Sequence, residues 1–242
     1  MIWVSVIKNT KKVSCLMSVY NGENHLEQSV ESILRQTYDN FEFLIVNDGS
    51  NDNTEIILKD FKAKDNRIKI FDNNINLGLT KSLNKLISNA KGDFIARQDA
   101  DDISFPERFK SQVEYLSKKN LDACTTKAVG RQSQKVLHNK TSFIPTKVVF
   151  KYKNPFIHGT LMIKTGVIKK IGMYNEIFKF SQDYKLFYDL MSNGYKVEIL
   201  NECLYELNEK ENISSLFKLE QEEYANKVKY DIKLKNIYFK NK

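Results

Sequence analysis

The acidic segment Asp99-Ala100-Asp101-Asp102 places three carboxylates within four residues. Carboxylates this close together repel one another, and some of them bind protons unless a cation neutralises them. Hard divalent cations such as Mn²⁺ and Mg²⁺ bind carboxylate oxygens together with phosphate oxygens of a substrate. Asp99, Asp101 and Asp102 are therefore candidate ligands of Mn²⁺ or Mg²⁺, and a metal held there can stabilise a diphosphate leaving group. The competing interpretation is a solvated acidic loop or a set of helix-capping residues.

Two turns nearer the N-terminus carry further polar candidates. Tyr20 and Asn21 occupy the first turn, and Asp48 and Gly49 occupy the second. An aromatic ring can stack on a nucleobase and an amide can hydrogen-bond to it. A carboxylate can accept a hydrogen bond from a ribose hydroxyl, and glycine lets the backbone come close to a ligand. Each motif taken alone is equally typical of an ordinary turn.

Asp183 is the candidate general base. Transfer of a sugar with inversion needs a carboxylate that takes the proton of the acceptor hydroxyl as it attacks the anomeric carbon. The other interpretation is an acidic residue that stabilises the dipole of a helix start. His158, in a loop, can contact substrate or phosphate, although a lone loop histidine is more often structural. Arg97 flanks the acidic cluster, where it can orient a carboxylate or contact a phosphate.

Alternating strands and helices are predicted to position these residues. Apolar runs predict strands at 13–19, 41–46, 68–71 and 94–96, and helical periodicity predicts helices at 26–36, from about 54 and at 79–87. This order implies an α/β fold with a mostly parallel central sheet and helices on both faces. Ligands bind at the carboxyl ends of the strands in such sheets, and both turns and the acidic cluster lie there.

Beyond the acidic cluster the pattern is less regular. Ser104, Pro106 and Glu107 form a capping-box pattern that predicts the start of a helix running to about Lys118. Residues 121–150 give no clear pattern. Further predicted elements are a strand at 160–163, helices at 165–171 and 181–194, and a last strand at 196–200.

Composition excludes several classes of protein. The 242 residues carry 38 Lys and Arg against 30 Asp and Glu, a net charge of +8 that is scattered without a compact basic block. We therefore expect no nucleic-acid binding. The three cysteines are far apart with no CxxC pair, which predicts neither a zinc site nor a disulfide framework and is typical of a reducing, cytoplasmic setting. No apolar run approaches the roughly 20 residues of a membrane-spanning helix.

Taken together and in this order, the motifs resemble the family 2 glycosyltransferases of the GT-A fold. The resemblance runs from about Val13 to about Ser214, which is most of the chain. The matching segments are Val13–Glu23, Ser32–Thr37, Val46–Ser50, Asn76–Leu79, Ala96–Asp102, Asn154–Gly159 and Ser181–Tyr184. Each segment is modest, but seven in the right order are specific.

The resemblance implies one GT-A domain over residues 1–213, with a Rossmann-like donor half at about 13–105 and an acceptor half at about 106–213. It implies an inverting, metal-dependent transferase that uses a nucleotide-sugar donor, UDP-hexose or UDP-HexNAc. Relatives build lipopolysaccharide, capsule or exopolysaccharide on a glycan or lipid-linked acceptor at the cytoplasmic membrane face. Asp183 matches the general base, and Asp99 and Asp101, with Asp102 adjacent, match the metal-binding motif. The candidates for nucleotide-sugar binding are Ser18, Tyr20, Asn21, Glu23, Asp48, Gly49, Ser50, Gly78, Arg97, Asp99 and His158.

One segment departs from the family pattern. Many relatives carry Tyr-Arg-x-His after the last strand, where a basic residue can approach the diphosphate, and this chain has Tyr205-Glu206-Leu207-Asn208. The departure keeps open a non-catalytic, sugar-nucleotide-binding subunit of a glycan assembly complex. A sugar nucleotidyltransferase would need a glycine-rich basic loop after the first strand, and a dinucleotide-dependent oxidoreductase would need GxGxxG there; both motifs are missing.

The segment 214–242 is predicted to be a basic helical tail dotted with aromatic residues. Such a helix can lie on an anionic membrane surface, which would bring the protein close to a lipid-linked acceptor at the inner face of the cell membrane. The alternative is a helix that packs on its own domain.

Overall fold

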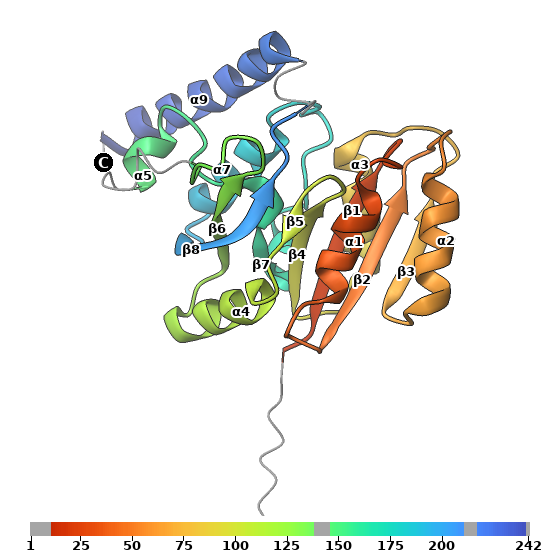
Figure 1. Ribbon diagram of the computed structural model, residues 1–242. Helices are drawn as coiled ribbons and strands as arrows, with labels where there is room; N and C mark the ends of the chain where they lie inside the picture. The colour runs from red at the N-terminus through yellow and green to blue at the C-terminus, as the bar shows by residue number, and fades with distance from the viewer. Residues whose placement is uncertain (1–10, 138–145, 211–216, 241–242) are drawn as a thin grey trace, which may run out of the picture.

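The computed structural model describes residues 11–137, 146–210 and 217–240, with side chains of the last helix described as far as Lys233. A mixed sheet with the strand order β3-β2-β1-β4-β7-β6-β8-β5 forms its centre (Figure 1). The strands are β1 (Val13–Val19), β2 (Phe41–Asn47), β3 (Ile68–Asp72), β4 (Phe94–Asp99), β5 (Ile103–Ser104), β6 (Ala123–Gly130), β7 (Met162–Lys164) and β8 (Val197–Leu207). The helices are α1 (Leu26–Leu34), α2 (Thr54–Lys64), α3 (Leu79–Asn89), α4 (Arg108–Lys119), α5 (Thr146–Phe150), the 3₁₀ turn η2 (His158–Thr160), α6 (Thr165–Lys170), α7 (Gln182–Ser192) and α9 (Lys218–Lys240).

The first half of the chain forms the parallel part of the sheet. Strand β1 pairs in parallel with β2 on one side and β4 on the other, and β2 pairs in parallel with β3. All seven residues of β2 are buried because helices cover both faces of a parallel sheet. One apolar core lies under α1, α2 and α4, and a second lies under α3, α6 and α7. The predicted fold class, a sheet with helices on both faces, is confirmed.

The second half adds antiparallel pairs. Strand β7 runs antiparallel to both β4 and β6, β8 runs parallel to β6, and the short β5 pairs antiparallel with the end of β8. Strand β8 is longer than the predicted 196–200 and continues to Leu207, because its C-terminal part gains β5 as a partner. This extension carries Tyr205 and Leu207 to the carboxyl end of β4.

The predicted capping box at Ser104 is wrong. Helix α4 begins at Arg108, and Glu107 precedes it without a side-chain capping bond. Ser104 instead lies in β5, where its Oγ donates a hydrogen bond of 2.6 Å to Gln98 Oε1. A short strand therefore follows the acidic cluster before the helix begins, and the hydroxyl of Ser104 bonds to a side chain of β4.

Helix α9 lies across the molecule beside α7 (Figure 1). Its Val228 is completely buried and belongs to the core cluster that includes α7. The predicted domain boundary at 213/214 falls within 211–216, outside the described residues. In the described part of the chain, no helix combines the length and the apolar character needed to cross a membrane.

Candidate active site

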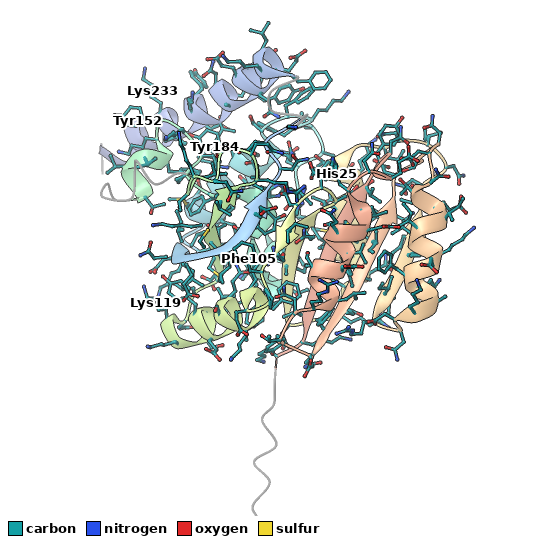
Figure 2. All side chains as sticks on the ribbon, in the orientation of Figure 1. His25, Phe105, Lys119, Tyr152, Tyr184 and Lys233 are labelled. Carbon is teal, nitrogen blue, oxygen red and sulfur yellow. The ribbon has the colours of Figure 1, made fainter. Side chains whose placement is uncertain are left out.

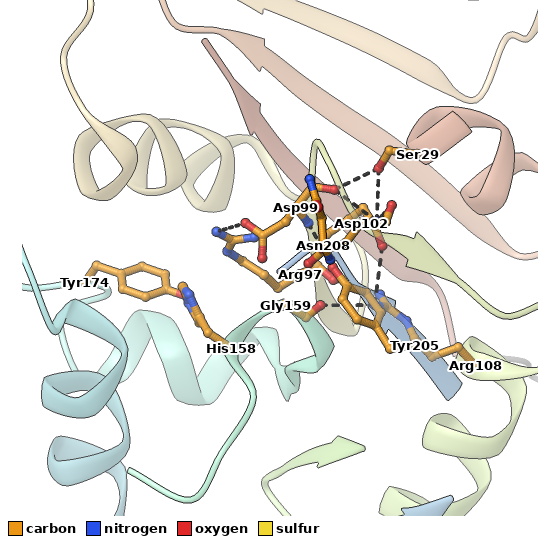
Figure 3. Close-up of polar contacts among 11 residues, drawn as sticks. Ser29, Arg97, Asp99, Asp102, Arg108, His158, Gly159, Tyr174, Tyr205 and Asn208 are labelled. Carbon is orange, nitrogen blue, oxygen red and sulfur yellow. Dashed lines mark hydrogen bonds and ion pairs between the residues drawn. The ribbon is translucent and has the colours of Figure 1, made fainter. Parts of the chain in front are cut away.

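A pocket of about 510 Å³ lies between the carboxyl end of β4 and the first turn of α7. Its charged and titratable lining includes Arg97, Asp99, Asp101, Asp102, Lys153, His158, Asp183 and Lys229. The pocket therefore brings together Arg97 and the predicted metal ligands with His158 and the predicted base, which are more than 50 residues away in the sequence. Figure 3 shows four of these residues, Arg97, Asp99, Asp102 and His158, with their polar neighbours.

Asp99 ends β4 and is held by its neighbours on all sides. Its carboxylate lies 2.7 Å from Arg97 Nη2, and its backbone N–H donates to Tyr205 Oη at 3.2 Å (Figure 3). Its backbone carbonyl accepts a hydrogen bond from Ser29 Oγ at 2.7 Å. These contacts fix the direction of the acidic segment where the strand ends.

Asp101 and Asp102 carry the electrostatic signature of crowded carboxylates. Burial, followed by the charge of Asp99, raises the pKa of Asp101, and burial with the charges of Asp99 and Asp101 raises the pKa of Asp102 well above its usual range. Asp102 Oδ1 accepts a hydrogen bond of 2.7 Å from the backbone N–H of Asn208. A divalent cation would relieve this repulsion, since it binds carboxylate oxygens.

The acidic cluster does not form a complete metal site by itself. Among the described residues, no group of three or more His, Cys, Asp and Glu side chains is arranged to hold an ion. Mg²⁺ and Mn²⁺ are commonly held by one or two carboxylates plus substrate phosphates. The oxygen donors of this pocket therefore fit a metal that arrives with, or is completed by, a diphosphate.

Arg97 is buried next to Asp99, with 3% of its surface exposed. Within the described residues, its Nε and Nη1 have no hydrogen-bond partner. An unpaired buried donor carries a desolvation penalty that an oxygen-bearing ligand would remove. Nε and Nη1 together carry three N–H groups without a partner, on a side chain that lines the pocket.

His158 lies on the other side of Arg97 from Asp102 (Figure 3). Its Nε2 is 2.6 Å from Tyr174 Oη. Burial, together with the positive charge of Arg97, lowers the pKa of His158 well below its usual range. The imidazole is therefore neutral near pH 7, and a role as a proton donor is disfavoured.

Asp183 lies in the first turn of α7, directly after Ser181 and Gln182. Ser181 has a left-handed backbone conformation, with φ at +51°, that turns the chain into the helix. Asn154 Nδ2 donates a hydrogen bond of 2.7 Å to Asp183 Oδ2. Burial raises the pKa of Asp183, although this hydrogen bond opposes the shift. The sequence placed Asn154 in a matching segment but did not indicate this contact.

The two N-terminal turns are bound to each other and not to the pocket. Asn21 N–H donates to Ser50 Oγ at 2.9 Å, and Asn51 N–H donates to Asn21 Oδ1 at 3.0 Å. Glu23 Oε2 accepts hydrogen bonds from both the backbone and the side chain of Asn53. The loop after β1 and the loop after β2 therefore form one polar surface at the same edge of the sheet.

Asp48 is 2% exposed and accepts three hydrogen bonds. The donors are Asn73 Nδ2 at 2.7 Å, Leu77 N–H at 2.9 Å and Gly78 N–H at 2.9 Å. A carboxylate has about four acceptor positions, so about one is left for a ligand. Asp48 thus anchors the loop before α3, a role that its position in a turn did not predict.

The remaining predicted residues border this edge. Gly49 has φ at +75°, and a Cβ there would lie 2.6 Å from the backbone carbonyl carbon of Ile75. Glycine is therefore required for the contact between two loops as well as for the turn. The ring of Tyr20 is 49% exposed and available for stacking. Ser18 is the register partner of Asp99 across β1 and β4.

Arg108 supports the pocket from α4 and was not singled out in the sequence. It is completely buried, and its guanidinium donates to the carbonyl of Arg97 at 2.8 Å and to that of Gly159 at 3.0 Å. It thereby ties β4 to the loop that carries His158. An arginine in the first turn of an amphipathic helix is normally solvated, so no local signal marks this one.

Gly159 packs tightly against the site. A Cβ at this position would lie 2.6 Å from Tyr205 Oη and 2.8 Å from Asp99 Oδ2. We expect Gly159→Ala to displace these two side chains and to lower the free energy of unfolding by about 1–3 kcal/mol, the usual cost of overpacking. Thermal and urea unfolding measure the change. Gly166→Ala is the control, because a Cβ there meets nothing within 4 Å; equal destabilisation by both variants would contradict the prediction.

Comparison with known proteins identifies relatives of this chain. The sequence profile of glycosyl transferase family 2 matches residues 14–179. The uncharacterized glycosyltransferase MJ1057 of Methanocaldococcus jannaschii is 34% identical, over 85% of this chain and 74% of its own. The O-antigen biosynthesis glycosyltransferase WbnJ of Escherichia coli is 34% identical, over 79% of this chain and 72% of its own.

Solved structures share the fold at low sequence identity. S. aureus TarS 1–349 in complex with UDP-GlcNAc has a TM-score of 0.72 and 20% identity, over 83% of this chain and 59% of that one. The mannosyltransferase PcManGT of Pyrobaculum calidifontis, in complex with GDP-Man and Mn²⁺, has a TM-score of 0.71 and 17% identity, over 88% of this chain and 61% of that one. The chain thus spans about 60% of the length of these two solved chains, and 36% of a longer solved chain of TarS. Because the profile matches more than half of the chain and two relatives are 34% identical over most of it, this chain belongs to glycosyl transferase family 2.

Proposed function

We propose that this glycosyltransferase moves a sugar, with inversion, from a UDP-hexose or UDP-HexNAc to a glycan or lipid-linked acceptor in the synthesis of a cell-surface polysaccharide. The observation that carries the proposal is that Asp183 and the acidic cluster of Asp99, Asp101 and Asp102 line one pocket. An inverting displacement needs a base near the acceptor and a positive centre near the leaving group, and one pocket offers places for both.

The donor would lie along the carboxyl ends of β1, β2 and β4. The nucleoside would contact the polar surface that joins Tyr20, Asn21 and Glu23 to the loop after β2, and the diphosphate would reach the acidic cluster. TarS with UDP-GlcNAc and PcManGT with GDP-Man and Mn²⁺ share this fold and support a nucleotide-sugar donor. Arg97 would donate from Nε or Nη1, which have no partner among the described residues, to a sugar hydroxyl or a phosphate oxygen.

Mn²⁺ or Mg²⁺, when bound by Asp101 with Asp99 or Asp102, would supply positive charge to the leaving diphosphate. The residues of the chain account for the rest of the reaction. The acceptor hydroxyl oxygen forms a bond to the anomeric carbon while the bond from that carbon to the diphosphate oxygen breaks. Asp183 takes the hydroxyl proton, and Asn154 orients its carboxylate. The electron pair of the broken bond leaves with the diphosphate, and the configuration of the sugar inverts.

Asp183 is expected to set the acid limb of the pH profile. A general base must be ionised, and burial raises its pKa, so kcat/KM falls below a pH that lies above the usual aspartate range of about 4. Asn154→Ala removes a bond to the ionised form, so the limb should move to still higher pH. The rate of UDP release as a function of pH measures the acid limb in the wild type and in Asn154→Ala. Asn193→Ala, at the exposed end of α7, is the control; an unshifted limb in Asn154→Ala would reject this role for Asn154.

A second candidate function is a non-catalytic, sugar-nucleotide-binding subunit. The replacement of the family Arg and His by Glu206 and Asn208 favours it: Glu206 pairs with Arg131 at 2.7 Å, and Asn208 is buried against Asp102. A screen of common UDP-sugars with Mn²⁺, measuring released UDP, separates the two functions. Release from at least one donor supports the transferase, while UDP binding without release from any donor supports the subunit.

We further propose that the protein acts at the cytoplasmic face of the cell membrane, where a lipid-linked acceptor would be presented. Peripheral contact between α9 and anionic lipid is part of this proposal. Sedimentation of the full chain with anionic liposomes measures that contact, in the wild type and in a Lys218→Glu/Lys233→Glu variant that changes two exposed lysines of α9; equal sedimentation would dismiss it.

A further inference from the structure

Helix α9 is attached beside the proposed base. Ser181 N–H donates a hydrogen bond of 3.0 Å to Gln221 Oε1, and Ser181 Oγ donates one of 2.8 Å to the backbone carbonyl of Gln221. Ser181 lies two residues before Asp183. The helix is therefore held against the element that carries the base.

Aromatic and apolar contacts complete this attachment. The ring of Tyr224 packs against Phe178 and Phe180, with centroid distances of 5.7 Å and 6.0 Å. One helical turn further, Val228 is fully buried. These side chains pack against the rest of the domain, so this face of α9 is part of the domain interior.

A single face of α9 also lines the pocket. Gln221, Ala225 and Lys229 are four residues apart, which places them on one side of a helix, and all three line the same pocket as Asp183. Lys229 lies about 12 Å along the helix from Gln221, at about 1.5 Å per residue. The pocket thus continues from the base along α9.

A second lysine lines the same pocket from another segment of the chain. Lys153 directly precedes Asn154, the residue that holds Asp183, and it lines the pocket together with Tyr152. Figure 2 shows Tyr152 at the end of the molecule where α9 lies. Both lysines therefore belong to the elements around the base and not to β4, which carries the acidic cluster.

Neither lysine forms an ion pair with a carboxylate in the described residues. The hydrogen bond of Lys229 is to the amide oxygen of Asn226 in its own helix, at 3.2 Å. By contrast, Lys227 pairs with Glu223 at 2.8 Å. Two cations that face a pocket without carboxylate partners attract an anion, and lysine is a common ligand of phosphate.

We propose that Lys153 and Lys229 form a subsite for a phosphate group of the acceptor. The proposal rests on the proposed function, because it treats Asp183 as the base that faces the acceptor hydroxyl. The acceptor would therefore be a phosphorylated glycan or a lipid-linked sugar phosphate, and a neutral sugar would bind more weakly. Helix α9 is then a part of the acceptor site, whether or not it also contacts a membrane.

Calorimetric titration with methyl phosphate tests the subsite. The protein is titrated once with UDP and Mg²⁺ present, which fill the donor site, and once with EDTA and without UDP. We expect the double variant Lys153→Ala/Lys229→Ala to raise the dissociation constant of methyl phosphate by about 10-fold, as loss of two charge-assisted contacts should. The control is Lys151→Ala/Lys227→Ala, which removes two neighbouring lysines that do not line the pocket and should leave the constant unchanged.

Decyl phosphate, titrated in parallel, separates the two sources of the phosphate. Tighter binding than methyl phosphate indicates a lipid-linked acceptor, and equal binding indicates a soluble one. The same methyl phosphate affinity in the wild type and the pocket double variant, under both conditions, would overturn the proposal. Loss of UDP binding in the pocket double variant would also overturn it, since the lysines would then hold the donor. Failure of the wild type to bind UDP with Mg²⁺ would instead count against the proposed function.

Discussion

Asp183→Asn is expected to lower kcat by about 10³-fold and to leave the dissociation constant of UDP unchanged. The amide has nearly the shape of the carboxylate, but it cannot take the proton of the acceptor hydroxyl. The residue lies in the first turn of α7, on a different element from the acidic cluster, so donor binding should not depend on it. Steady-state rates of UDP release and calorimetric titration with UDP give the two quantities.

Asp189→Asn is the matched control for this variant. Asp189 lies in the same helix and pairs with Lys185 at 2.5 Å, but it does not line the pocket. We expect its kcat to stay close to that of the wild type. An Asp183→Asn variant that turns over at the wild-type rate would show that the base is another residue. A large loss of UDP binding in that variant would show that Asp183 belongs to the donor site.

Asp101→Ala is expected to weaken Mn²⁺-dependent UDP binding by about 100-fold. Asp101 borders the pocket, and burial, followed by the charges of the neighbouring carboxylates, raises the pKa values of Asp101 and Asp102. Loss of a ligand lowers metal affinity at least as much as loss of an outer-shell partner, which costs about 10–100-fold. The measurement is the dissociation constant of UDP with Mn²⁺ and with EDTA, in the wild type and the variant.

Glu107→Ala provides the control for charge alone. Glu107 is close in the sequence, about half exposed and paired only loosely with Lys110, at 3.5 Å. It should keep the wild-type ratio of UDP affinities with and without Mn²⁺. If Asp101→Ala also keeps that ratio, Asp101 is not a metal ligand.

Much of the fold could be predicted from the sequence because strands and helices in the first half follow clear periodicity. The buried run of β1, the run of β2 and the turns that end them fall where the pattern placed them. Parallel pairing then brings the strand ends to one edge, as the register of Ser18 with Asp99 illustrates. In the second half of the chain, the role of Asp183 was predicted from the resemblance to family 2. Periodicity could not link this residue to the acidic cluster, because the two are far apart in the sequence.

What the sequence did not predict depends on long-range contacts. The buried role of Arg108 arises because β4 and the Gly159 loop direct their carbonyls toward α4. The engagement of Asp48 arises because the loop before α3 folds back onto it. Ser104 matched a local capping pattern, but in the structure it pairs with Tyr205 of β8 as part of a strand. None of these contacts can be predicted from the spacing of residue types in the sequence, because each joins residues of separate segments of the chain.

The place of α9 is a further case. Its composition is compatible with a membrane surface as well as with the wall of a domain, because it contains both lysines and apolar or aromatic residues along its length. Over its described side chains, α9 packs on its own domain, as the hydrogen bonds of Ser181 to Gln221 and the burial of Val228 show. A helix that looks like an appendage in the sequence thus lines the pocket beside the base.

Proton NMR of the released sugar tests inverting transfer from a UDP-sugar without knowledge of the acceptor. In the absence of an acceptor, water can take its place, and the first anomer to appear reports the stereochemistry before mutarotation mixes the two. With an α-linked donor such as UDP-GlcNAc and Mn²⁺, we expect the β-anomer to appear first and Asp183→Asn to abolish its formation. Appearance of the α-anomer first would contradict inversion and the assignment of Asp183 as the base.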